Sequence, residues 1–237
     1  MKNQFRFTFD NIQSQYELAI TKGYKIITCA DFNEKYWNKG RLPDSKILIN
    51  RVDIDFSIKK AEIIGGIFNK LGIKGSFYVR LHAPEYNPFS FENYRILKHL
   101  IDTGHEIGYH SEIVDQAAIW NETAEENLTR DIQIINRMFN IKIKGVASHG
   151  GMTGLNNLDF WKDKEPIDFE LLYEAYDWFD KTFYISDSEW TRWKCYDNGN
   201  IVVGDNRSLG EHVQCGQYPS IYSLIHSDTY YNRHFYE

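Results

Sequence analysis

The sequence predicts an α/β fold built on parallel strands, and two observations carry this prediction. Apolar runs of strand length alternate with amphipathic stretches of helix length along most of the chain. Residues able to do chemistry then fall where the expected strands end, which is where parallel α/β folds bind their ligands. At 237 residues, the chain fits one large domain more easily than two.

The first strong strand is expected over residues 46–55, "KILINRVDID". A helix follows, with Ser57 as its N-cap and Gly72 at its end. The remaining elements are expected, in order, as a strand at 74–80, a helix at 90–104, a strand at 105–110, a helix at 123–139, a strand at 143–148, a helix around 168–179 and strands at 182–186, 200–204 and 220–226. Residues 1–45 match no motif and are expected to pack on the fold as an N-terminal extension or to contact another subunit.

Composition excludes several classes of protein. A net charge of −6 argues against a nucleic-acid partner, which normally requires a basic face. Three scattered cysteines are too few for a disulfide framework or a cysteine-type zinc site. The N-terminus has no apolar signal core, and no run approaches the ~18 apolar residues of a transmembrane helix, so a cytoplasmic location is expected. The aromatic content of 16% indicates a large aromatic core, or rings that line a groove for a sugar.

Five groups of reactive residues follow predicted strands. A single carboxylate pair or histidine at a strand end usually caps or packs, but five such groups at one edge of a sheet favour a functional site. They are Asp53 with Asp55, His110, Ser148-His149-Gly150, Ser186-Asp187 and His226.

Three segments carry a resemblance to a known family. "NRVDIDFS", "YNPFSFENYRILKHLIDTGHEIGYHSE" and "YSLIHSDTYY" resemble the polysaccharide deacetylase (NodB-homology, carbohydrate esterase) superfamily, in its bacterial variant with an R-x-D-x-D first motif. The resemblance spans roughly residues 47–226 in the right order. It implies a distorted (β/α) barrel, expected to have seven strands, in a single catalytic domain over residues 1–237. It also implies hydrolysis of an N-acyl group from an amino sugar, assisted by a divalent metal such as Zn²⁺.

The resemblance also implies roles for individual residues. Asp53 matches the general base, and Asp55 and His110 match metal ligands. His226 matches the histidine that protonates the departing amine, and Asp187 matches the acidic residue that orients it. Further residues are implied as substrate contacts or walls of the pocket: Tyr86, Asn87, Trp190 and Trp193.

Two departures from the family pattern affect the metal site. The second histidine of the usual pair is replaced by Val114, which cannot bind metal, and the Arg-x-Pro motif is absent. His149, in "VASHGG", is the candidate for the third ligand because imidazole is a common zinc donor. Asp115 and Glu112, on the loop after His110, are its rivals.

Three hypotheses therefore stay open. The leading one is a metal-dependent hydrolase that removes an acetyl or formyl group from a nucleotide- or lipid-linked amino sugar, a precursor of a bacterial surface polysaccharide. The second is a metal-free hydrolase of another C–N bond on the same fold, and the third is a carbohydrate-binding domain whose catalytic site has decayed.

Overall fold

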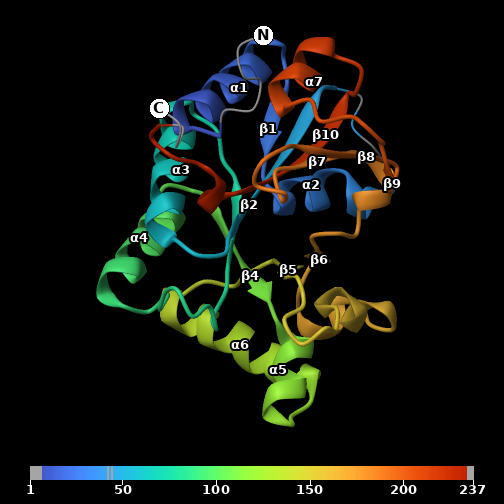
Figure 1. Cartoon of the computed structure of the whole chain (residues 1–237). Helices are drawn as coiled ribbons and strands as arrows, with labels where there is room; N and C mark the ends of the chain where they lie inside the picture. Colours follow the sequence, from blue (N-terminus) through green and yellow to red (C-terminus); the bar gives the residue numbers. More distant parts are fainter. Residues whose placement is uncertain (1–6, 42, 44, 234–237) are drawn as a thin grey trace.

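The computed structural model describes residues 7–41, 43 and 45–233. Its centre is a ten-stranded sheet in the order β6-β5-β4-β3-β2-β10-β7-β8-β9, with β1 paired to β2 (Figure 1). The strands are β1 (Lys25–Ile27), β2 (Ile47–Ile54), β3 (Ser76–Val79), β4 (Glu106–Ser111), β5 (Gly145–Ser148), β6 (Tyr173–Glu174), β7 (Phe183–Ser186), β8 (Lys194–Asp197), β9 (Asn200–Ile201) and β10 (Ser220–His226).

Every pairing from β6 across to β7 is parallel, and only β8 and β9 join the sheet in antiparallel fashion. The predicted α/β class is therefore confirmed. The expected strand count is not, because the sheet has ten strands rather than seven. Among the described residues the pairing does not return from β9 to β6, so hydrogen bonds do not close the sheet into a complete barrel.

Helices connect the parallel strands, and α3, α4 and α6 follow one another along one side of the sheet (Figure 1). Ser57, Ser90 and Thr123 cap α3, α4 and α6 through their side chains, as their position before apolar-periodic segments predicts. The helices are α1 (Phe9–Thr21), α2 (Cys29–Lys35), α3 (Ile58–Lys70), α4 (Phe91–Asp102), α5 (Ile113–Trp120), α6 (Ala124–Phe139) and α7 (Leu209–Cys215), with short 3-10 helices at Trp37–Lys39, Asn157–Lys162, Pro166–Phe169, Phe179–Lys181 and Ser227–Thr229.

Strand β2 separates two hydrophobic cores, since alternate side chains of a strand point to opposite faces. Leu48 and Val52 pack into the core that the helices cover. Ile47 and Ile49 pack into a second core on the inner face of the sheet. Arg51, two residues after Ile49, begins the polar part of this inner face, and the residues at positions 53 and 55 continue it.

Aromatic rings dominate the inner core. Trp178 contacts the rings of Tyr173 and Tyr222 and is itself fully buried. Glycine makes room for these rings, because a Cβ on Gly145 would lie 2.2 Å from Cζ of Tyr173. Much of the 16% aromatic content therefore forms core, as one of the two readings of the composition predicts.

Two predicted elements differ from the structure. Residues 168–179 form part of a 3-10 helix, the short strand β6 and turns rather than one helix. The buried Glu174 explains this, because its carboxylate accepts hydrogen bonds from the backbone amides of Ser148 and Tyr176 and so favours an extended path over helical hydrogen bonding. The strand predicted at 200–204 is limited to the exposed pair β9 at the sheet edge.

The N-terminal segment contributes a helix, an edge strand and a second helix. β1 pairs in parallel with the first residues of β2, while β3 pairs with the last ones. α1 packs against α7 and α3, and α2 lies against the inner face beside β2. Residues 1–6, 42 and 44 of the predicted extension lie outside the described residues.

Candidate metal and catalytic site

Polar side chains gather in a cleft of about 380 Å³ at the carboxyl ends of the parallel strands. The cleft is lined by five of the residues that the sequence places at strand ends: Asp53, Asp55, His110, His149 and His226. These residues come from β2, β4, β10 and the segments that directly follow β2 and β5. Parallel strands bring them together because their carboxyl ends share one edge of the sheet.

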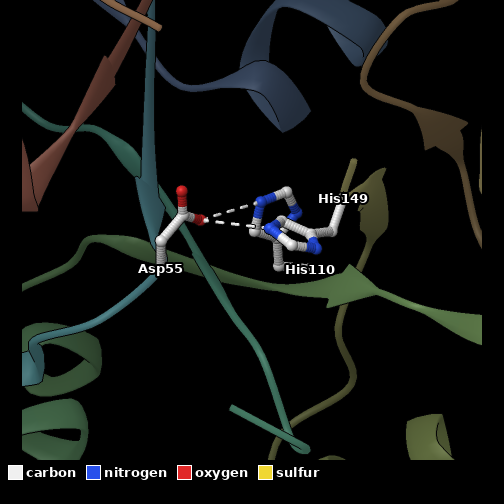
Figure 2. A group of neighbouring side chains, drawn as sticks. All are labelled: Asp55, His110 and His149. Atoms are coloured by element: carbon white, nitrogen blue, oxygen red, sulfur yellow. Dashed lines mark ion pairs between the residues drawn. The ribbon is translucent and has the colours of Figure 1, made fainter. Parts of the chain in front are cut away.

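Asp55, His110 and His149 form a compact group able to hold a metal ion (Figure 2). One carboxylate oxygen, Oδ1 of Asp55, lies 3.3 Å from Nε2 of His110 and 4.0 Å from Nε2 of His149. The ligand atoms all lie within 4.8 Å of one another, and their types are those that bind zinc. The sequence-predicted set of ligands is therefore brought together in space.

The orientation of both rings fits a metal site. Nδ1–H of His110 donates to the carbonyl oxygen of Ala147 on β5 at 2.8 Å, which leaves Nε2 free to face the cleft. Nδ1 of His149 lies 3.2 Å from Oε1 of Glu112, an ion-pair distance without hydrogen-bond alignment. Oδ1 of Asp55 is buried without a hydrogen bond. A cation between these atoms would satisfy that orphaned oxygen, so the residues fit the ion.

The rival ligands are held elsewhere. Nε and Nη2 of Arg80 both donate hydrogen bonds to Oε1 of Glu112, at 3.1 and 2.8 Å. Asp115 accepts hydrogen bonds from the backbone amides of Met152 and Thr153 and thereby fixes the loop after His149. Glu112 thus lies next to Nδ1 of His149, and Asp115 fixes the segment that carries His149.

Arg51 forms a buried ion pair with Asp53. Its Nε and Nη2 atoms lie 2.9 and 2.7 Å from the two carboxylate oxygens, and Arg51 is fully buried. Burial by itself would raise the pKa of Asp53, but the Arg51 guanidinium and His110 outweigh it and lower the pKa. Asp53 is therefore ionised at neutral pH. The sequence motif contained Arg51, but no separate role was predicted for it. Arg51 and Asp53 are two residues apart on one strand, so their side chains share a face.

His226 and Asp187 form a second charged pair across the cleft. Nδ1–H of His226 donates to Oδ1 of the buried Asp187 at 2.7 Å, and Nε2 faces Asp55 Oδ2 at 3.9 Å. Burial alone would lower the pKa of His226, but the hydrogen bond to Asp187 and its charge raise the pKa to about 9. The imidazole is therefore protonated at neutral pH, with Nε2–H directed into the cleft.

Asp228 is a functional candidate that the sequence interpretation missed. Its carboxylate accepts hydrogen bonds from the backbone amides of Asp55 and Phe56, at 3.2 and 2.9 Å, and so fixes the end of β2. The signal available in the sequence was its place directly after the strand end at His226, within "IHSD".

Aromatic rings form the walls of the cleft. Trp190 lines it and is 41% exposed, with its ring against Phe56. The structure brings further rings to the cleft that sequence reasoning did not single out: Tyr176, Phe179, Tyr184 and Tyr196. They come from turns and from β7 and β8, where no motif marked them.

Three of the predicted substrate contacts do not line this cleft. Trp193 is 2% exposed and packs against Phe7 in the core. The hydroxyl of Tyr86 donates to the carbonyl oxygen of Ile54, and the side chain of Asn87 accepts from the amide of Phe89, so both shape the loop before α4. Trp193 is therefore a core residue, Tyr86 supports the end of β2, and Asn87 lies exposed on the loop before α4.

The comparisons with known proteins found distant structural matches. No family model matches the sequence, and no curated protein matches it. Solved structures that resemble it include the deacetylase PplD of Streptococcus pyogenes in complex with acetate (12% identity over 60% of this chain and 63% of that chain, TM-score 0.46). IcaB from Ammonifex degensii (15%, 64% and 70%, TM-score 0.47) and BA3943 from Bacillus anthracis, a CE4 family pseudoenzyme (17%, 80% and 58%, TM-score 0.46), also resemble it.

The matched part of PplD and of BA3943 is less than two thirds of each chain. Because the TM-scores lie below 0.5 and the group includes a pseudoenzyme, the likeness does not by itself assign an activity. Within the part of the chain that the structure describes, no helix combines the length and the apolar character needed to span a bilayer.

Proposed function

We propose that this protein is a metal-dependent hydrolase that removes an N-acyl group from an amino sugar. The observation that carries the proposal is the meeting of three elements in one cleft: the Asp55–His110–His149 group, the ionised Asp53 and the protonated His226. Amide hydrolysis needs these three functions, namely an electrophile that polarises the carbonyl, a base for water and an acid for the leaving amine.

Asp55, His110 and His149 would hold the ion, with Zn²⁺ favoured by two imidazoles and one carboxylate. Such an ion polarises the acyl carbonyl and lowers the pKa of water from ~16 to ~7. Asp53 would accept the proton of the attacking water. Its Oδ2 lies 3.3 Å from Nε2 of His110, at the edge of the ligand group, and this distance supports the role. Arg51 keeps this carboxylate ionised and fixed, at the expense of some of its basicity.

His226 would supply the proton that the leaving nitrogen requires. Its Nδ1–H is held by Asp187, so Nε2–H is the proton available to the cleft. Without this proton the tetrahedral intermediate would expel hydroxide, a better leaving group than an amide anion, and return to the amide. The pKa of about 9 keeps the acid form populated at neutral pH.

The walls of the cleft support a sugar as the substrate. Pyranose rings present apolar faces that stack on aromatic side chains, and the cleft offers Trp190, Tyr184 and Tyr196 among its rings. We propose that residues 1–237 work as one catalytic domain in the cytoplasm, on a nucleotide- or lipid-linked amino sugar from surface polysaccharide biosynthesis. The acyl group would be acetyl or formyl.

The direct test is the release of acetate or formate from nucleotide-linked N-acetyl and N-formyl amino sugars by protein loaded with Zn²⁺ or Co²⁺. Asp53→Asn should abolish release while the metal content stays unchanged. Asp102→Asn, at an exposed aspartate of α4, is the matched control and should leave the rate unchanged.

Three results would contradict the proposal. Full activity of Asp53→Asn would remove Asp53 from the role of base. Full turnover by protein stripped with a chelator would favour a metal-free hydrolase, and bound sugar without turnover under any metal would favour a carbohydrate-binding domain.

A further inference from the structure

A second group of metal-binding side chains lies away from the catalytic cleft. It consists of Cys195 on β8, Asp205 in the loop after β9 and His212 on α7. Cys195 and His212 are each 1% exposed, and the Asp205 side chain is 9% exposed. Three segments that are separate in the sequence thus bury a thiol, a carboxylate and an imidazole against one another.

The three side chains converge on a single atom. Nε2 of His212 lies 3.4 Å from Sγ of Cys195 and 3.5 Å from Oδ2 of Asp205. If Nε2 carries a proton, it can point that proton well at only one of the two partners. If Nε2 is unprotonated, its lone pair faces the carboxylate oxygen. A cation at the centre satisfies sulfur, nitrogen and oxygen together.

The spacing of these atoms also matches a tetrahedral ion. Zinc binds sulfur at about 2.3 Å and nitrogen or oxygen at about 2.0–2.2 Å, so tetrahedral ligand atoms are separated by about 3.3–3.6 Å. The separations of 3.4 Å between Nε2 and Sγ and of 3.5 Å between Nε2 and Oδ2 fall in this range. We propose that Cys195, Asp205 and His212 supply three ligands of a zinc-type ion, distinct from the ion of the catalytic cleft.

Arg207 is compatible with this site. Its Nε binds Oδ1 of Asp205 at 3.0 Å and its Nη2 binds Oδ2 at 2.6 Å, so the guanidinium orients the carboxylate. Oδ1 can remain with Arg207 while Oδ2 binds the ion, because each carboxylate oxygen has two lone pairs. Thiolate and imidazole together favour zinc over the hard cations Mg²⁺ and Ca²⁺.

The ion would stabilise β8, a strand that contributes to the wall of the catalytic cleft. Cys195 is followed by Tyr196, which lines the cleft. Within the described residues, β8 is paired only to β7 and to the two-residue β9. An ion that ties β8 to α7 and to the loop between them would hold this edge of the sheet in place. The role of the cleft in this paragraph rests on the proposed function, whereas the binding of the ion does not.

Cobalt absorption distinguishes the two metal sites. A cysteine thiolate bound to Co²⁺ gives a sulfur-to-cobalt charge-transfer band in the near ultraviolet, and the Asp55–His110–His149 group contains no sulfur. Chelator-treated protein titrated with Co²⁺ should develop the band, and His110→Ala should keep it.

Cys195→Ser should lose the band, whereas Cys29→Ser and Cys215→Ser should keep it. Because Cys195→Ser changes a core residue, Asp205→Asn and His212→Gln provide a second test. Each should weaken Co²⁺ binding by more than the roughly 10- to 100-fold that loss of an outer partner produces. In the His110→Ala background, zinc should raise the melting temperature, and Asp205→Asn should remove that rise.

Absence of the band in the wild-type protein, or a band that survives Cys195→Ser, would overturn this inference. Neither result would affect the proposed hydrolase, whose ion is measured by the zinc that His110→Ala removes. Absence of turnover in the wild-type protein under any metal, together with a retained cobalt–thiolate band, would contradict the proposed hydrolase and leave this inference standing.

Discussion

The guanidinium of Arg51 binds both carboxylate oxygens of Asp53 at the inner face of the sheet, where both side chains are almost completely buried. The two residues are next-but-one neighbours on β2, so their side chains share the inner face of the strand. The proposed base therefore owes its charge and its position to a residue of its own strand.

The first prediction concerns this pair. Arg51→Met should lower the free energy of unfolding by about 3–5 kcal/mol, because it leaves a buried carboxylate without its partner. It should also lower turnover strongly, because the carboxylate of Asp53 would lose the two hydrogen bonds that fix its position. Urea denaturation followed by circular dichroism measures the stability.

The double variant Arg51→Met/Asp53→Asn is the control for this prediction. It should regain much of the lost stability without regaining activity, because no charge remains buried alone. Equal destabilisation of the single and double variants would mean that shape, rather than the ion pair, makes Arg51 necessary.

The second prediction is a pH dependence set by Asp187. His226 acts in its protonated form, so the wild-type kcat/KM should fall as pH rises through about 9. Asp187→Asn removes the charge that raises the pKa of His226, and the alkaline limb should move to lower pH with a loss of about 10²-fold in kcat at neutral pH. Glu189→Gln, at a surface acid near the same cleft, should leave the limb in place.

The same shift affects stability. The folded-state pKa of about 9 exceeds the ordinary 6.5, so the charged pair stabilises the fold fully below pH 6.5 and this contribution is lost between pH 6.5 and 9. In Asp187→Asn the free energy of unfolding should change less across that window. An unchanged slope would show that Asp187 does not set the pKa of His226.

The third prediction concerns Glu112, which stands behind His149 at 3.2 Å. Glu112→Gln should weaken zinc binding by about 10- to 100-fold, because a carboxylate on the outer nitrogen orients a histidine ligand and raises its basicity. Competition with a metal-binding dye measures the affinity. Glu85→Gln is the matched control, because Glu85 also pairs with Arg80 but is exposed. Similar losses in both variants would point to Arg80 rather than to His149.

The fourth prediction separates two tryptophans of one segment. Trp190→Ala should raise KM for the sugar while the stability stays near that of the wild type, since Trp190 is 41% exposed in the wall of the cleft. Trp193→Ala should lower the free energy of unfolding by about 3–5 kcal/mol and leave KM of the folded enzyme unchanged, because Trp193 lies in the core. Steady-state kinetics and denaturation on both variants check this, and a rise in KM for Trp193→Ala alone would reverse the assignment.

The path of the chain was predictable where local signals agreed with burial. The strand at β2, the capped helices α3, α4 and α6, and the strands β4, β5 and β10 follow from periodicity and capping residues. The helix predicted at residues 168–179 was wrong. Their apolar spacing suits a helix, but the chain there forms a short strand and turns, which bring Tyr173 and Trp178 into the inner core.

The sequence by itself determined which residues stand at the ends of parallel strands, because strand alternation and strand ends are local properties. It therefore indicated Asp53, Asp55, His110 and His226 as neighbours at one edge. It could not choose among His149, Glu112 and Asp115, since all three follow strand ends.

Only the tertiary structure decided how these three side chains are partnered, because the partners are distant in the sequence. Arg80 donates a hydrogen bond to Glu112, and a backbone amide of the loop after His149 donates one to Asp115. His149 faces Asp55 instead. A buried side chain turns toward whichever partner satisfies its charge, and that partner is set by the packing of strands and loops rather than by spacing along the chain.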